Sequence, residues 1–266
     1  MDAQTDPVIK KIAQVNPYFL AADMVRKRIS WDFNYKSWLS RARINKMKDS
    51  AKEKKAVILC NGPSLLKVDF QTLKGLQTFG LNKINLLFDK TDFRPNTVIA
   101  VNPLVLEQNR AFFNRTEISL LLDSSASPFI RLRSNVAFIH SWHGARFAKD
   151  CSISIPQGNT VTYVALQIAF HMGFKDVALV GCDHNFATRG PANMTVNSEA
   201  TDASHFDPNY FSGGDQWQLP DLPASEFFYN LANRYYSAHG RRIINATEGG
   251  KLEIFRRMNL KEWIAS

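Results

Sequence analysis

The sequence lacks the features that mark membrane-spanning, secreted and disulfide-linked proteins. None of its 266 residues lies in an apolar run that approaches the roughly 18 residues of a membrane span, and the first residues lack the basic-then-apolar order of a signal peptide. The three cysteines, Cys60, Cys151 and Cys182, show no C-x-x-C spacing, so we expect reduced, buried thiols rather than disulfides or a zinc site. These absences predict a soluble cytoplasmic protein.

The common catalytic signatures are absent as well. There is no G-x-x-x-x-G-K-[ST] sequence, no G-x-G-x-x-G after a strand, and no G-x-S-x-G elbow. This argues against P-loop kinases and GTPases, ordinary dinucleotide dehydrogenases and α/β-hydrolases. No histidine, cysteine or carboxylate spacing typical of a metal site is present, and we expect neither a metal nor a cofactor.

Positive charge is concentrated near the start of the chain. The formal net charge is +9, and residues 1–55 hold thirteen Lys and Arg against six Asp and Glu, a net of +7. We therefore distinguish a basic helical arm, residues 1–55. Trp31, Tyr35 and Trp38 fall at helical spacing, so this stripe either docks on the main domain while the cations stay solvated, or meets an anionic surface at the inner membrane or a phosphate-bearing partner. Nucleic acid is not expected, since the rest of the chain is nearly neutral.

Residues 56–266 alternate between short β-branched runs and helical stretches. A helix is predicted over Val161–Met172, where apolar residues step by three or four and Gly173 follows as a stop signal. This alternation predicts an α/β, Rossmann-like fold with a mostly parallel sheet and helices on both faces. The expected strands are Ala56–Cys60, Phe79–Asn82, Thr97–Asn102, Ile118–Leu122, Val136–His140, Val177–Gly181 and Arg242–Asn245.

A long excursion, residues 184–224, interrupts this pattern. It is rich in Gly, Pro, Asn, Asp and Ser, and it carries the aromatics Phe206, Tyr210, Phe211 and Trp217. Connections of this length are usually functional or disordered, and the aromatics favour an ordered lid over a ligand site.

Polar residues follow successive predicted strands. In a parallel sheet such residues meet at one edge, where ligands bind. Amides, hydroxyls and glycine backbone there can hold a phosphate or nucleotide without a cation. Asp183 could also bind a magnesium-phosphate or a sugar hydroxyl. The residues at strand ends are Asn61-Gly62-Pro63-Ser64, Asn82, Asn102 and Asp183, and Gln157-Gly158-Asn159-Thr160 stands before the predicted helix.

His205 stands inside the predicted lid, in Ser204-His205-Phe206. An ordinary histidine titrates near neutral pH, so it can take a proton from a hydroxyl that attacks a substrate. The alternative is a histidine that only bonds the loop around it. The position favours a general base that reaches an acceptor once the lid has closed.

These segments, in this order, resemble a family of bacterial glycosyltransferase-like proteins that includes the motility-associated flagellin-modifying (Maf) proteins. The family is related to the CMP-sialic-acid-dependent sialyltransferases and to the archaeal, MptE-like hydroxymethylpterin diphosphokinases. The resemblance runs from about residue 56 to 257 and does not cover the arm. Its pieces are Leu59–Leu65, Phe79–Asn82, Asn102–Leu104 with Glu107-Gln108, Gly158–Val161, Val180–Asp183, Ser204–Phe206 and Asn245–Gly250.

The resemblance implies a role for each matching position. Asn61, Gly62 and Ser64 would contact the donor's phosphate and ribose. Asn82 and Asn102 would contact its phosphate or sugar, and Thr160 with the neighbouring backbone of Gly158 and Asn159 would hold its sugar or carboxylate. His205 would activate an acceptor hydroxyl for an inverting displacement. The implied partners are a nucleotide-activated sugar and a glycan, lipid-linked or protein acceptor.

The chain departs from the sialyltransferases at one point. Their two tyrosines, which help the nucleotide leave without a metal, are not found after Asp183, where His184-Asn185-Phe186 follows. Asn185 or Tyr210 would replace them, or the nucleotide differs. Two alternatives remain open: a diphosphokinase that transfers pyrophosphate from ATP to a pterin with Mg²⁺ on Asp183 and Asp89, and a non-catalytic protein that binds a sugar nucleotide.

Overall fold

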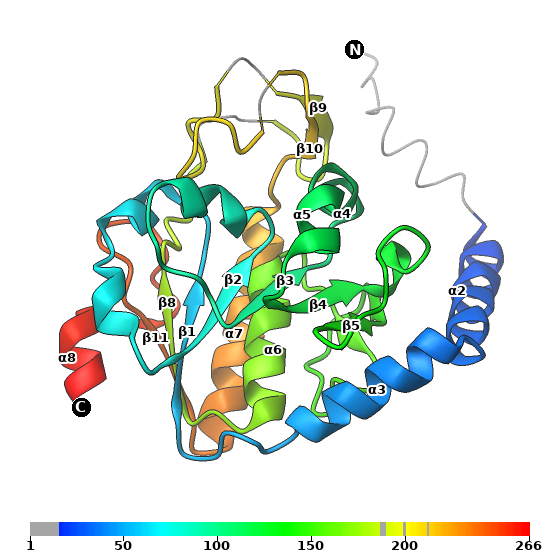
Figure 1. The fold of residues 1–266 in the computed structure, drawn as a ribbon, viewed down its shortest axis with the longest axis horizontal. Coiled ribbons are helices and arrows are strands. Elements are labelled where there is room, and N and C mark those ends of the chain that lie inside the picture. Colours follow the sequence, from blue (N-terminus) through cyan, green and yellow to red (C-terminus); the bar gives the residue numbers. More distant parts are fainter. Residues whose placement is uncertain (1–15, 187–189, 199–200, 212) are drawn as a thin grey trace, which may run out of the picture.

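A computed structural model describes residues 16–186, 190–198, 201–211 and 213–266 of the chain. Its centre is an eight-stranded sheet in the order β12-β11-β8-β1-β2-β3-β4-β5 (Figure 1). Each pair of neighbouring strands in this sheet is parallel. The α/β, Rossmann-like fold predicted from the sequence is confirmed.

Seven strands of the sheet lie at the predicted β-branched runs. Both faces of the sheet are covered, so these strands are almost wholly buried and their sequences are continuously apolar rather than alternating. The eighth strand, β12, was not predicted, because two exposed arginines carry no strand pattern. The bounds are β1 Lys55–Leu59, β2 Gln77–Leu81, β3 Thr97–Ala100, β4 Ser119–Asp123, β5 Val136–Ile139, β8 Asp176–Val180, β11 Arg242–Asn245 and β12 Arg256–Arg257.

Two apolar clusters cover the faces of the sheet. On one face, α6 (Val161–Met172) and α7 (Leu222–Ala238) pack on strand residues such as Ile58. Helix α6 has the predicted bounds, and Gly173 ends it in the left-handed conformation with φ +94°. Leu59, the next residue along β1, points to the other face and packs among shorter helices. These are the 3₁₀ turns η1 Pro63–Lys67, η2 Phe70–Leu73, η3 Ile84–Asp89 and η4 Ser124–Ala126, with α4 Pro103–Gln108, α5 Arg110–Arg115 and α8 Leu260–Ala265.

The arm contains α2 (Pro17–Asp32) and α3 (Tyr35–Met47), and α3 lies along the edge strand β5 (Figure 1). Ser40 Oγ accepts a hydrogen bond of 3.0 Å from the backbone N–H of Phe138 in β5. Helix α3 thereby satisfies a backbone N–H that would otherwise be exposed at the open edge of the sheet. Among the described residues, no helix is long and apolar enough to cross a bilayer.

Of the three aromatic residues predicted to dock the arm on the main domain, only Trp31 does so. Trp31 is 7% exposed and its ring lies edge-on to that of Phe138, whereas Tyr35 and Trp38 are 60% and 59% exposed. The reason is that small residues, Ser37 and Ser40, form the face of α3 that approaches the sheet. The two aromatic side chains at positions 35 and 38 therefore fall on the outer side.

The predicted lid is compact where it is described. It contains a two-stranded antiparallel sheet of β9 (Thr195–Asn197) and β10 (Gln216–Gln218), at the top of Figure 1. A further small pair, β6 (Ser141–Trp142) with β7 (Ile155–Pro156), precedes α6. The lid aromatics are each 7% exposed or less, which agrees with an ordered lid: Phe206, Tyr210, Phe211 and Trp217.

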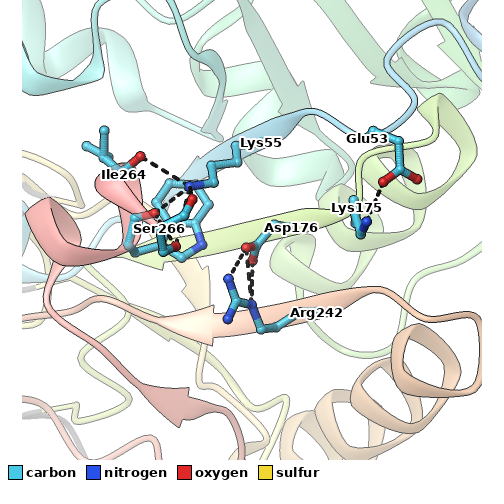
Figure 2. A network of polar contacts seen from close by, with 8 residues as sticks. Glu53, Lys55, Lys175, Asp176, Arg242, Ile264 and Ser266 are labelled. Atoms are coloured by element: carbon cyan, nitrogen blue, oxygen red, sulfur yellow. Dashed lines mark hydrogen bonds and ion pairs between the residues drawn. The ribbon is translucent and has the colours of Figure 1, made fainter.

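Charged side chains join the amino ends of the strands to one another and to α8 (Figure 2). Arg242, at the start of β11, donates hydrogen bonds of 3.1 Å to both carboxylate oxygens of Asp176, at the start of β8. Lys55 Nζ donates to the carbonyl oxygens of Trp263 and Ser266, each at 2.6 Å, and to that of Ile264 at 3.1 Å. Lys55 therefore satisfies the free carbonyls at the end of α8.

Replacement of Lys55 tests this role. We expect Lys55→Met to lower the free energy of unfolding by about 1–2 kcal/mol, because charge-assisted bonds to several helix-end carbonyls are lost. Chemical denaturation followed by circular dichroism measures the change. The matched control is Lys67→Met, which removes an exposed ion pair with Glu248 and should have no measurable effect. Equal stability of the two variants would contradict the role.

Candidate functional site

The chain order of the strands reverses between β1 and β8. From β1 the sheet continues through β2 to β5 on one side, and from β8 through β11 to β12 on the other. The loops beyond the carboxyl ends diverge at such a point and leave a crevice. A cavity of about 680 Å³ lies there, lined by the ends of β1, β2, β3 and β8, by the first turn of α6 and by the lid. Its volume is typical of a small-molecule site.

Nine of the twelve predicted site residues line this cavity. The other three, Ser64, Gly158 and Tyr210, are buried behind it. The nine are Asn61, Gly62, Asn82, Asn102, Asn159, Thr160, Asp183, Asn185 and His205.

The amino end of α6 forms one wall. Gly158 and Asn159 both have positive φ, and a Cβ on Gly158 would lie 2.3 Å from the Tyr163 ring, so only glycine fits this turn. Thr160 caps the helix, and its Oγ1 accepts from the N–H of Thr162 at 3.3 Å. The first N–H groups of a helix point along its axis and have no partner within the helix. The positive end of the α6 dipole therefore lies at this wall, where it can stabilise an anion.

The loop after β1 is tied to the end of β8. Asp183 Oδ2 accepts hydrogen bonds from Ser64 Oγ at 2.7 Å and from Ser64 N at 3.2 Å. Gly62 permits this contact, since a Cβ there would lie 1.9 Å from the same oxygen. Ser64 and Asp183 therefore position the Asn61-Gly62 backbone, and one carboxylate oxygen of Asp183 is already engaged.

Asn61 and Asn82 lie near the Tyr210 hydroxyl and act to lower its pKa, but burial has the larger, opposite effect. The Oδ1 atoms of both amides are buried and have no hydrogen-bond partner. Burial raises the pKa of Tyr210 above its usual 10.0, so it stays protonated at neutral pH. Buried acceptors without partners are costly, and such atoms are typical of a site that a ligand or a lid movement completes.

Asn102 joins β3 to the lid. Its Oδ1 caps α4 by accepting from the N–H of Leu104 at 2.9 Å, and its Nδ2 donates to Gln218 Oε1 in the lid at 3.3 Å. The same side chain therefore shapes the cavity wall and holds the lid next to it.

His205 is held on two sides. Its Nδ1 lies 2.7 Å from Asp202 Oδ2, and its ring stacks on Tyr210 with centroids 4.0 Å apart and planes 3° apart. Burial would raise the pKa of Asp202, but the hydrogen bond and charge of His205 outweigh it and hold this pKa below 3.8. Asp202 is therefore ionised at neutral pH and fixes the tautomer with the proton on Nδ1, which leaves Nε2 as an acceptor.

A second histidine on the cavity also bonds a carboxylate. His184 Nε2 lies 2.9 Å from Glu226 Oε1, and the residue has a positive φ of 52°. Neither Asp202 nor Glu226 was predicted from the sequence. The i, i+3 spacing of Asp202 and His205 was a usable signal, whereas Glu226 comes from α7, 42 residues after His184.

Lys83 is another residue that the sequence analysis missed. Its Nζ donates to the carbonyl oxygen of Tyr210 at 2.8 Å and lies 3.2 Å from Asp215 Oδ2. Burial lowers the pKa of this lysine below 10.5. These two contacts offset the cost of burying the Lys83 cation and attach the end of β2 to the lid.

The cavity floor contains two of the three cysteines, Cys60 and Cys182. All three are buried and unpaired, as predicted. Cys60 Sγ lies 3.6 Å from Thr162 Oγ1. In the part of the chain that the structure describes, no group of three or more His, Cys, Asp or Glu could hold a metal. Asp89, considered above for Mg²⁺, is exposed and does not line the cavity.

The fold is that of a doubly wound α/β protein, and a cavity lies at its switch point. Residues 31–189 match the family model described as 6-hydroxymethylpterin diphosphokinase MptE-like, and this is more than half of the chain. The chain belongs to this family. The match begins inside the arm, at Trp31, and ends before His205.

The comparison with solved structures supports the fold. The Maf glycosyltransferase from Magnetospirillum magneticum AMB-1 superposes with a TM-score of 0.50 at 16% sequence identity. The likeness covers 84% of this chain but 38% of that chain, so this chain corresponds to well under half of its length. No curated protein matches the sequence. The resemblance to Maf and MptE-like proteins is confirmed, and the relation to sialyltransferases stays a prediction.

Proposed function

We propose that this protein is an inverting, metal-independent glycosyltransferase that moves a sialic-acid-like sugar from a CMP-activated or other nucleotide-activated donor to a hydroxyl of a glycan, lipid-linked or protein acceptor. The observation that carries the proposal is the Asp202–His205 pair on the lid side of the cavity. A histidine oriented by a carboxylate through Nδ1 is the arrangement expected of a general base. The Maf likeness supports the class of reaction.

In this reaction the chain would supply a base, groups that stabilise the leaving phosphate, and hydrogen-bond acceptors for the donor's hydroxyls. The acceptor oxygen attacks the anomeric carbon, the bond from that carbon to the nucleotide phosphate breaks, and the acceptor proton passes to His205 Nε2. Charge that develops on the phosphate meets the first turn of α6, after the Thr160 cap, and the backbone at Gly62. Asn61 and Asn82 would accept hydrogen bonds from ribose or sugar hydroxyls through their unpartnered oxygens. Asn185, exposed on the cavity wall, would assist the leaving phosphate.

A second candidate is favoured by the family match. An MptE-like diphosphokinase would transfer pyrophosphate from ATP to a pterin, a reaction that needs Mg²⁺ held by carboxylates. Two carboxylates, Asp183 and Asp221, line the described part of the cavity wall. Asp183 Oδ2 already accepts two bonds from Ser64, and Asp221 accepts bonds from the N–H of Ala224 and from Asn193 Nδ2. A glycosyltransferase would use the Asp202–His205 pair in the arrangement that is present, and we therefore prefer this function. A non-catalytic sugar-nucleotide-binding protein would need the cavity but not the pair.

A nucleotide panel separates these functions. Thermal unfolding is followed with CMP, CDP, UDP, GDP and ATP, each with and without Mg²⁺. A ligand at one hundred times its Kd stabilises the folded state by about 2.7 kcal/mol, which is readily seen as a higher Tm. We expect CMP or another glycosyl-donor nucleotide to raise Tm without Mg²⁺. A shift with ATP alone, dependent on Mg²⁺, would instead favour the diphosphokinase.

Asn61→Ala tests the donor contact. We expect the nucleotide to bind roughly three- to tenfold more weakly, because one hydrogen bond in the bound state is lost. Calorimetry measures the Kd, and the Tm of the free variant reports any loss of stability. The control is Asn209→Ala, an exposed lid asparagine outside the cavity. Unchanged affinity in Asn61→Ala would remove this residue from the proposed donor site.

A further inference from the structure

Three exposed aromatic side chains come from the segment where α2 joins α3. Phe33 is 79% exposed, Tyr35 60% and Trp38 59%. We call these three residues the aromatic corner. Trp38 is fixed rather than loose, because its Nε1 donates to the carbonyl oxygen of Asp32 at 2.6 Å. Rings of this size are rarely left in water together without a partner.

The aromatic corner faces away from the domain. On α3, the buried residues Ser37, Ser40 and Ile44 form the face that meets β5, and Tyr35 and Trp38 lie on the opposite face. Helix α2 also carries exposed apolar side chains, since Val25 and Ile29 are 57% and 51% exposed at i, i+4 spacing. No described element of the protein covers this outer surface.

The same helices carry most of the positive charge. Residues 17–48 hold eight Lys and Arg against two Asp, a net of +6 out of +9 for the whole chain. Asp23 pairs with both Arg26 and Lys27, and Asp32 pairs with both Arg28 and Arg41, so each carboxylate is shared by two cations. Lys36 and Arg43 donate to the neutral carbonyl oxygens of Ser127 and Val136 in the domain. The arm therefore combines apolar rings with a net positive charge.

We propose that the arm binds peripherally to an anionic lipid bilayer, with the aromatic corner in the headgroup region and the cations near lipid phosphates. Tyrosine and tryptophan prefer this region because one end of each is apolar and the other polar. Helices that lie on membranes combine such rings with Lys and Arg. An interface with a second protein copy fits less well, since the centres of protein interfaces are depleted of charged residues. The proposal does not depend on which reaction the cavity performs.

The test is co-sedimentation of the full chain with vesicles of phosphatidylcholine alone or mixed with phosphatidylglycerol. We expect binding to the anionic vesicles that falls as salt rises from 50 to 500 mM, on the basis of screening. The double variant Phe33→Ser, Tyr35→Ser should bind on the order of tenfold more weakly. Arg26→Gln with Lys27→Gln should have a similar effect at low salt, at roughly fivefold for each cation.

The matched control is Phe227→Ser, which removes a ring that is 55% exposed on α7, away from the arm. It should sediment like the unchanged protein. Equal binding to neutral and anionic vesicles, or full binding by the Phe33→Ser, Tyr35→Ser variant, would overturn the proposal. So would a dimer in light scattering that this variant dissociates, because a second copy would then occupy the corner. None of these measurements requires a sugar donor.

Discussion

Replacement of His205 by alanine should leave nucleotide binding intact and slow sugar transfer by a factor of about one hundred to ten thousand. The imidazole is on the lid side of the cavity, where Nδ1 bonds Asp202, so it is available to an acceptor through Nε2. Loss of a general base acts on the transition state and little on the bound donor. The effect should therefore appear in kcat rather than in the Kd of the nucleotide.

Both quantities can be measured on one preparation, by calorimetry with the nucleotide and by product formation from the activated sugar. His239→Ala is the control, since His239 is exposed at the end of α7 and does not line the cavity. If His205→Ala turned over at the rate of the unchanged protein while His184→Ala did not, the base would be His184, oriented by Glu226.

Asp202→Asn should give the second large effect, a fall in kcat of about one hundred- to ten-thousandfold with donor affinity changed less than about threefold. The carboxylate accepts the Nδ1 proton of His205, whereas an amide Nδ2 would donate to that atom and leave Nε2 protonated. The serine-protease triad shows a loss of about 10⁴ for the same exchange. The Asn oxygen can still accept from the N–H of Ser204, which Asp202 Oδ1 binds at 2.7 Å.

The pH dependence gives a second test of this pair. The pKa of Asp202 is lowered in the folded protein, so the stability that its ionised form contributes is present above its unfolded value of about 3.8 and is lost as pH falls below it. The difference in unfolding free energy between the unchanged protein and Asp202→Asn should therefore shrink below about pH 4. For catalysis, the contradicting result would be a kcat of the Asp202→Asn variant equal to that of the unchanged protein across pH 6 to 8. Asp202 would then not orient a base.

Sequence patterns predicted nine of the residues that line the cavity. Asn61, Asn82 and Asn102 each lie at the end of a short apolar run that was predicted as a strand, and parallel strands bring such residues to one edge. The first turn of α6 was equally accessible, because Gly158, Thr160 and the apolar spacing mark a helix start. These inferences use only local periodicity and the geometry common to parallel sheets.

Side-chain direction could not be predicted in the same way. Ser64 was expected to face the donor, but its hydroxyl bonds Asp183, 119 residues away in sequence. Tyr210 was expected at the donor, but it lies beneath the His205 ring. In the arm, Ser37 and Ser40 face the sheet in place of the expected aromatic residues of α3, because small residues let this helix approach the backbone of β5.

The sequence by itself determined seven strands of the main sheet, helix α6 and the residues at the ends of those strands, because each depends on neighbours within a few positions. Only the tertiary structure decided which of these residues meet. The position of β8 beside β1 puts Asp183 next to Ser64, and the packing of the lid puts His205 between Asp202 and Tyr210. Strand order and lid docking depend on packing across the whole chain, which no local pattern encodes.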